Sequence, residues 1–210
     1  MDIEELKKLH ESKKAEIAAR LKYFEENGRD NEKIFMELCF CLCTPRSSAI
    51  KCDRIIKQLA SNGLLFNGAS NEIKKYMDEI SFPDEKSKYI VEARDRFVSQ
   101  NVNFIDFFKK FLSPAGAREW LIKNVGGLGR KEASHFLRNI GMGKNFAILD
   151  VHVMRNLKWF NVIEEIPEQL NDRKYMEIEN KMKKFSDEIS IPMDELDLLL
   201  WSKEAGFIFK

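Results

Sequence analysis

The apolar residues of this chain recur at the three- and four-residue spacing of an α-helix along nearly its whole length. Ile3, Leu6 and Leu9 begin one such stretch, which can run to Asn27. The alternation typical of strands is nearly absent, and the 210 residues include only 10 Gly and 5 Pro. The sequence therefore predicts an all-α protein of roughly ten helices joined by short connections.

Residues that start and stop helices divide the chain into segments. Ser47 or Ser48 can cap a helix that ends near Leu59, Ser70 can cap a short helix, and Pro83 precedes another. The stretch SNGLLFNGAS is expected to be a loop. The other expected helices span residues 3–27, 31–43, 85–99, 103–112, 115–124, 131–140, 150–159, 170–189 and 193–204.

The length limits the number of domains, and the cysteines indicate the cellular compartment. A chain of 210 residues fits one large domain or two small ones packed together. Its start, MDIEELKKLHESKKAEI, has no apolar secretory core, and no apolar run approaches a membrane span. The four cysteines lie close together between Cys39 and Cys52, unlike a disulfide framework. We therefore expect a cytoplasmic protein with buried structural thiols, metal or redox use being the alternative.

The charges are balanced over the whole chain but not along it. A net charge of +1, from 35 basic and 34 acidic residues, argues by itself against nucleic-acid binding. However, the basic block Arg118–Lys158 holds eight basic and three acidic residues, and the acidic block Glu164–Asp197 holds eleven acidic and five basic ones. We therefore expect the basic block to face DNA and the acidic block to form a surface that points away from the DNA. Two ordinary solvated helix faces are the alternative.

The most informative string is VGGLGRKEASHFLRNIG, from Val125 to Gly141, within the basic block. A turn with Gly126, Gly127 and Gly129 separates two expected helices, and such a turn allows positive φ and close backbone approach. The exposed N–H groups of the turn and of the following helix can bind a phosphate without reading a base. A plain corner between helices would give similar glycines. No G-x-x-x-x-G-K-[ST] pattern is present, which argues against a nucleotide-binding loop.

Beyond these patterns, the chain resembles a known superfamily. The string GLGRK, followed 19 residues after its lysine by the aspartate of AILDVHVMR, is similar to the helix-hairpin-helix DNA glycosylases. More narrowly, ELCFCLCT, KEASHFLRNIG, AILDVHV, IPEQL and DLLLWSKEAGFIFK resemble the archaeal-type 8-oxoguanine DNA glycosylase/AP lyases. The resemblance implies a single domain over residues 1–210 with its hairpin at 115–141. It also implies a cleft between two helical subdomains, about 31–150 and 1–30 plus 151–210.

The resemblance implies a bifunctional enzyme that excises 8-oxoguanine and nicks the strand 3′ to the abasic site by β-elimination. Lys131 falls on the position of the lysine that forms a Schiff base with the sugar. A lysine is ordinarily protonated at neutral pH, but the positive end of a helix dipole disfavours that ammonium. Asp150 would help to deprotonate Lys131 and would stabilise positive charge at C1′. From position alone, an exposed phosphate contact would be the favoured role of Lys131, and the pairing with Asp150 reverses that preference. Asp150 can also be a helix N-cap.

The resemblance also implies residues that hold the extruded base. Trp201 would stack on the base, Phe82 would be a second pocket aromatic, and Lys210 would contact the base. Core packing is the alternative for both aromatics, and a frayed end is the alternative for Lys210. The apolar string GFIFK favours docking of this tail against the body. The expected contacts to DNA are Gly127, Gly129, Arg130 and His152.

Double-stranded DNA containing 8-oxoguanine is the expected partner of a monomer that is associated with the nucleoid and not with a membrane. No cofactor and no catalytic metal are expected, apart from a monovalent cation that the hairpin carbonyls could hold. The string CTPRSSA departs from the family pattern, and with Arg46 there we expect substrate preference and opposite-base discrimination, rather than the reaction itself, to differ. Two rival hypotheses remain, namely a glycosylase of this fold for another damaged base, and a non-catalytic module that only binds DNA or a protein.

Overall fold

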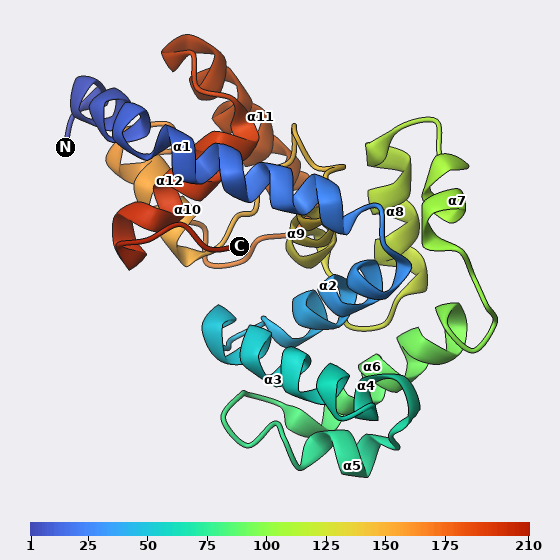
Figure 1. The fold of residues 1–210 in the computed structure, drawn as a ribbon. Helices are drawn as coiled ribbons and strands as arrows, with labels where there is room; N and C mark the ends of the chain where they lie inside the picture. The colour runs from blue at the N-terminus through green and yellow to red at the C-terminus, as the bar shows by residue number, and fades with distance from the viewer.

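The computed structural model describes residues 1–210, and all of its regular structure is helical. This confirms the predicted all-α fold. Twelve helices follow one another with short connections (Figure 1), and most bounds lie within one or two residues of those expected. The helices are α1 (Ile3–Asn27), α2 (Asn31–Cys43), α3 (Ala49–Ser61), α4 (Leu64–Asn67), α5 (Ser70–Lys74), α6 (Pro83–Phe97), α7 (Phe104–Lys109), α8 (Pro114–Asn124), α9 (Arg130–Asn139), α10 (Val151–Trp159), α11 (Asp172–Ile189) and α12 (Met193–Ala205).

Two local predictions were wrong, and both concern the segment after α3. The expected loop contains α4, because Gly63 turns the chain at a φ of +78° and the Asn62 side chain accepts the Leu64 N–H at 3.1 Å. A helix of four residues is too short to show a periodicity. Ser70 is the first residue of α5 and not its cap, and the Glu72 carboxylate instead accepts the Ala69 N–H at 2.8 Å.

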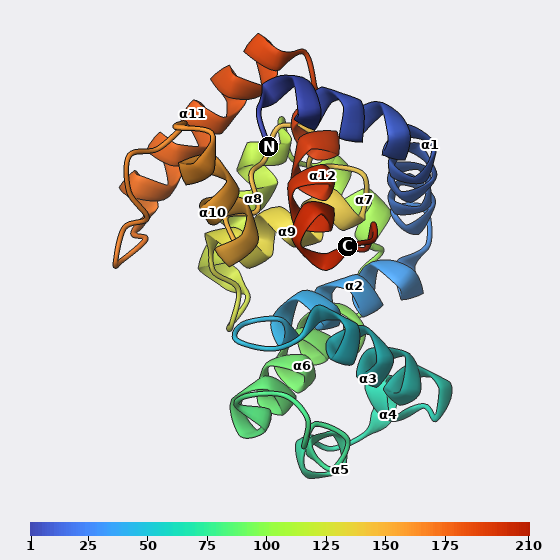
Figure 2. The ribbon, with the colours of Figure 1, turned by 90° about the vertical axis from the view of Figure 1, so that its left-hand side faces the viewer.

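The molecule has two hydrophobic cores. One contains 30 buried residues between Ile34 and Phe146, and the other contains 21 residues from α1 and from the chain from Ala147 onward. Figures 1 and 2 show the corresponding arrangement, with α2–α6 on one side and α1, α10, α11 and α12 on the other. The chain passes from the first core to the second between Phe146 and Ala147. The expected subdomain boundaries, near residues 30 and 150, remain predictions.

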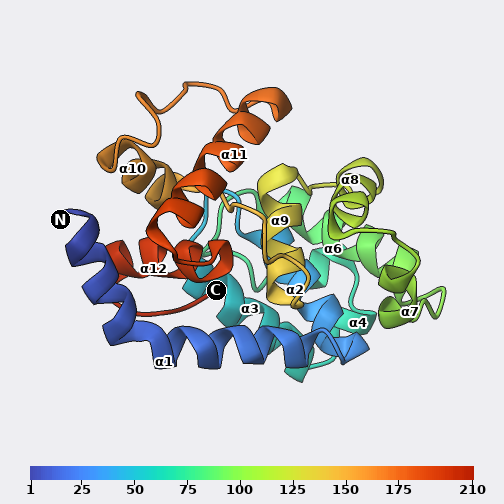
Figure 3. The ribbon, with the colours of Figure 1, turned by 90° about the horizontal axis from the view of Figure 1, so that it is seen from above.

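Helix α9 lies where the two halves of the molecule meet. It packs against α8, α2 and α1, and the view from above shows it between α11 and α12 on one side and α2, α6 and α8 on the other (Figure 3). Ala133, Phe136 and Leu137 bury its apolar face in the first core. The opposite face of α9 can therefore present polar side chains to the second half.

The chain end and the cysteines behave as the sequence predicts. The tail after α12 docks against the body, with Ile208 and Lys210 buried. Cys39, Cys41, Cys43 and Cys52 are all buried free thiols, which confirms the prediction of structural thiols. None of the twelve helices is both long and apolar enough to cross a bilayer.

Candidate active site

The hairpin between α8 and α9 is built around Gly127. Its φ is +82°, and an added Cβ would lie 2.5 Å from the Tyr89 ring, so both the backbone and the neighbouring ring require glycine. Gly129 is the N-cap of α9 with an ordinary φ of −84°. The N–H groups of Gly127, Gly129 and Lys131 donate no hydrogen bond within the chain. They remain free for an anion at the positive end of the helix.

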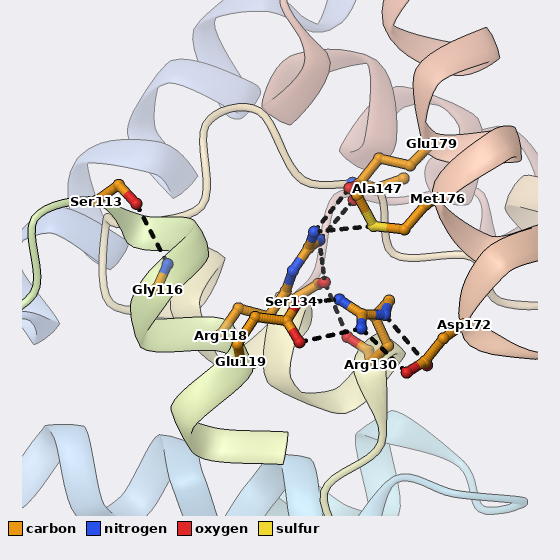
Figure 4. A network of polar contacts seen from close by, with 10 residues as sticks. All are labelled: Ser113, Gly116, Arg118, Glu119, Arg130, Ser134, Ala147, Asp172, Met176 and Glu179. Atoms are coloured by element: carbon orange, nitrogen blue, oxygen red, sulfur yellow. Dashed lines mark hydrogen bonds and ion pairs between the residues drawn. The ribbon is translucent and has the colours of Figure 1, made fainter. Parts of the chain in front are cut away.

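Arg130 is not arranged as the sequence analysis expects. Its guanidinium binds Glu119 of α8 and Asp172 at the start of α11, the latter at 3.1 Å, and only 8% of the side chain is exposed (Figure 4). Two carboxylates therefore compete with any phosphate for this side chain. The DNA contact of Arg130 stays a prediction, and in the structure its side chain connects α9 to α8 and α11.

The acidic block does not simply turn away from the basic block. Arg118 donates to both oxygens of Glu179, at 2.7 and 2.9 Å, inside the fold (Figure 4). Arg138 pairs with Asp197 at 2.7 Å, and both of these side chains are buried. Together with Arg130, three arginines of the basic block are thus neutralised by acids of the acidic block. Charge counts along the sequence missed this pairing because they carry no information on which helices meet.

A cleft of about 800 Å³ opens between the two halves of the molecule. The loop after α2, the cleft-facing side of α9, the start of α10, helix α12 and the chain end all contribute to its lining. Five predicted site residues line it: Lys131, Asp150, His152, Trp201 and Lys210. Four others lie outside the lining: Phe82, Gly127, Gly129 and Arg130. The structure thus brings the two expected reactive groups and most of the expected base contacts into one cavity.

Lys131 enters this cleft from the first turn of α9. Its side chain is 23% exposed, and its Nζ lies 3.1 Å from the Glu132 carboxylate. No ion pair joins Lys131 to Asp150. Glu132 was not among the predicted site residues, although an acid in the first turn of a helix is a common arrangement. The Glu132 carboxylate therefore holds the Lys131 ammonium in the structure.

Asp150 is the N-cap of α10, as the sequence predicts. One carboxylate oxygen, Oδ1, accepts the N–H groups of His152 and Val153 at 2.9 and 2.8 Å. The second oxygen accepts no hydrogen bond within the chain. The cap therefore fixes the carboxylate at the cleft and leaves one oxygen available for chemistry.

Trp201 stands at the cleft wall in a group of aromatic rings. Its indole meets the rings of His152 and Phe207 edge to face, at centroid distances of 6.3 and 5.6 Å, and Phe209 lies 6.1 Å away. The ring is partly exposed, and it lines the cavity. Rings held on several sides in this way keep an aromatic face ready for stacking.

Lys210 is buried and lines the cleft. Its ammonium binds Glu37 of α2 at 2.8 Å and Asp53 of α3 at 2.7 Å, and it lies over the Phe40 ring. Burial alone would lower the pKa of Lys210, but Glu37 and Asp53 more than offset that effect and raise it. Lys210 therefore keeps its charge, but two carboxylates that do not line the cleft hold its ammonium.

Phe82 lies on the rim and not in the cavity. It is 49% exposed, has a φ of +59°, and its ring lies 5.7 Å from the Arg46 guanidinium. Arg46 itself has a φ of +55° and lines the cleft. The buried Lys86 ammonium donates to the Pro45 carbonyl and to Ser47 Oγ and so braces this loop. Lys86 was not predicted from the sequence, because a buried lysine has no local signature.

Helices joined by a glycine hairpin, with a lysine and a capping aspartate in one cleft, define the chain as a helix-hairpin-helix DNA glycosylase in its fold. A family model described as 8-oxoguanine DNA glycosylase matches residues 17–191. The chain belongs to this 8-oxoguanine DNA glycosylase family.

Individual relatives support that assignment. A Fusobacterium nucleatum protein named 8-oxoguanine DNA glycosylase/AP lyase is 43% identical over 98% of this chain and 96% of its own length. The protein of that name from Methanocaldococcus jannaschii is 38% identical over 98% of this chain and 99% of its own. The crystal structure of the M. jannaschii 8-oxoguanine glycosylase/lyase with a 15mer DNA containing 8-oxoguanine covers 98% of this chain and 99% of that chain, with a TM-score of 0.87 and 35% identity.

Proposed function

We propose that this cleft excises 8-oxoguanine from DNA and then cleaves the strand 3′ to the abasic site. The observation that carries the proposal is the presence of Lys131 and Asp150 in one cavity, next to Trp201 and Lys210. The names of the family and of its relatives agree with this activity. They give no support to a module that only binds DNA.

Lys131 is the nucleophile of the proposed reaction. After losing its proton, the Nζ lone pair forms a bond to C1′ of the damaged nucleotide, and the N-glycosidic bond breaks with its electron pair leaving on the base. Loss of the sugar ring oxygen from C1′ gives a Schiff base. Removal of a C2′ proton then expels the 3′ phosphate, which is the β-elimination step. The ion pair with Glu132 must open before Lys131 can attack.

Asp150 supports this chemistry from the N-terminus of α10. Its Oδ1 remains fixed by two backbone N–H groups, so the free oxygen can accept a proton from Lys131 or face the positive charge that develops at C1′. Replacement by Asn would keep the cap and remove the charge. Asp150→Asn therefore separates the catalytic role of Asp150 from its structural role.

The extruded base would enter the cavity to reach these groups. Trp201 offers a stacking face, and Lys210, the last residue of the chain, would contact the base from the cleft wall. Phe82 on the rim would contact the strand or the base from outside. These assignments explain why groups far apart in the sequence converge on one cleft.

Double-stranded DNA would cross the hairpin, where the free N–H groups of Gly127 and Gly129 and the imidazole of His152 can contact phosphates. We propose that the protein acts as a monomer and needs no organic cofactor. A monovalent cation held by hairpin carbonyls remains a prediction of the family resemblance.

The proposal is tested by separate assays of base release and strand cleavage on duplexes containing 8-oxoguanine. Wild-type protein is expected to perform both steps, and Asp150→Asn is expected to slow both by about 100-fold or more, the usual contribution of a positioned acid–base group. Intact guanine should remain in the DNA. A wild-type protein that releases no 8-oxoguanine, but releases another damaged base, would point to the rival glycosylase.

A further inference from the structure

His135 is a buried histidine whose imidazole borders the cleft and has no assigned task. It lies on α9 four residues after Lys131, so the two side chains share one face of the helix about one turn apart. The residue is 6% exposed and lines the cavity. Its ring meets Phe40 edge to face at a centroid distance of 5.4 Å, which fixes the orientation of the imidazole.

Both ring nitrogens of His135 are buried and have no hydrogen-bond partner in the chain. The main chain of Lys210 lies close to the ring, but outside hydrogen-bonding geometry. Among the polar side chains that line the cleft, only His135 has both of its hydrogen-bonding atoms in this state. Burying such groups without partners costs free energy, so proteins usually leave them only where something else binds.

The charge state of His135 limits what can bind there. Burial, reinforced by the positive charges of Arg138, Lys131 and Lys210, lowers the pKa of His135 well below its usual value. The ring is therefore neutral at physiological pH, with one nitrogen that donates and one that accepts. A neutral imidazole is a poor site for a phosphate, but it suits the adjacent carbonyl and N–H groups on the edge of a purine.

We propose that His135 hydrogen-bonds the polar edge of the extruded base and so helps to select it. This inference rests on the proposed function, because it needs a base in the cleft while Lys131 reaches C1′ of the same nucleotide. His135 would touch the base and not the sugar. His135 would therefore accelerate only the excision step, in which the base is still attached to the sugar, and not the later strand cleavage.

An abasic site supplies the test, because cleavage there uses Lys131 but has no base to bind. In single-turnover assays, His135→Phe is expected to slow the release of 8-oxoguanine by roughly tenfold, the effect of losing one buried hydrogen bond. Cleavage of a duplex with a preformed abasic site should change by less than about twofold. His135→Gln, which keeps a donor and an acceptor, should recover part of the excision rate and provides a second variant if His135→Phe does not fold.

A matched control comes from His10, which is buried to the same 6% but bonds Glu195 outside the cleft. His10→Phe should leave the ratio of excision to abasic-site cleavage unchanged. An unchanged excision rate in both His135 variants, or an equal loss of both activities, would overturn the proposal. Absence of 8-oxoguanine release by the wild-type protein would instead refute the proposed function itself.

Discussion

At the scale of single residues, Gly127 shows how the hairpin depends on the absence of a side chain. Its φ of +82° disfavours any other residue, and an added Cβ would also collide with Tyr89. Gly127→Ala is expected to lower the free energy of unfolding by about 1–3 kcal/mol and to weaken DNA binding, because the free N–H groups of the turn would move. Urea unfolding and titration with a DNA duplex measure the two effects.

Gly63 provides the matched control for this substitution. Its φ is +78°, but no atom lies within 4 Å of the place where a Cβ would stand. Gly63→Ala should therefore show the backbone strain alone and should leave DNA affinity unchanged. Equal losses of DNA affinity in the two variants would show that the hairpin has no special role in binding.

Residue roles were predictable from the sequence to different degrees. Lys131 and Asp150 could be found because a motif links them, and the structure places both in the cleft. Glu132 and His135 could not, because a carboxylate beside an ammonium and an imidazole without partners depend on the final packing. Phe82 was expected in the pocket, and it lies on the rim.

At the scale of helices, buried and exposed ion pairs tie α11 to the hairpin. The pair Arg118–Glu179 is buried on both sides, whereas the Asp172 side chain that binds Arg130 is 70% exposed. Glu179→Gln is expected to cost about 3–5 kcal/mol of unfolding free energy, because it leaves a buried guanidinium without its counter-charge. Asp172→Asn is expected to cost less than about 1 kcal/mol. Denaturant unfolding of both variants measures this difference.

Asp172→Asn also affects DNA binding. The substitution removes the charge of one of the two carboxylates that bind Arg130, so Arg130 can contact a phosphate more readily. The affinity for a duplex should therefore be higher at low salt, and it should decrease more steeply as salt is added. Salt titrations of binding would detect this change. A weaker affinity would instead mean that DNA binding requires the ion pair between Arg130 and Asp172.

Helices were the most predictable feature of the fold, because long segments repeat the apolar pattern over several turns. The exception is α4, which has four residues and depends on the turn at Gly63. The ion pairs between arginines and the acidic block could not be predicted from the sequence, for a different reason. They join residues up to 61 positions apart, such as Arg118 and Glu179, and no local pattern encodes that distance.

At the scale of the whole molecule, the first core contains all four thiols. Burial raises the pKa of Cys52 to about 11 and raises the pKa values of Cys39, Cys41 and Cys43 as well. The folded protein should therefore not react with iodoacetamide at pH 8, whereas all four thiols should react in denaturant. Mass spectrometry of the alkylated protein measures this. Fast labelling of Cys41, which the Lys131 and Lys210 charges approach, would contradict the packing.

The balanced charge of the whole chain also has a structural meaning. A net charge of +1 is compatible with DNA binding because some of the acidic side chains neutralise arginines inside the fold. The hairpin still leaves its N–H groups without partners, and Lys131 still lines the cleft. Whole-chain charge therefore says little about the one face that meets the duplex.

The central claim is that Lys131 is the amine that attacks the damaged nucleotide. Borohydride trapping on a duplex containing 8-oxoguanine tests it directly, because reduction converts a Schiff base into a stable covalent adduct. We predict an adduct with the wild-type protein, none with Lys131→Gln, and an undiminished one with Lys123→Gln, which alters an exposed lysine on the neighbouring α8. No adduct with the wild-type protein, or an adduct that persists in Lys131→Gln, would contradict the claim.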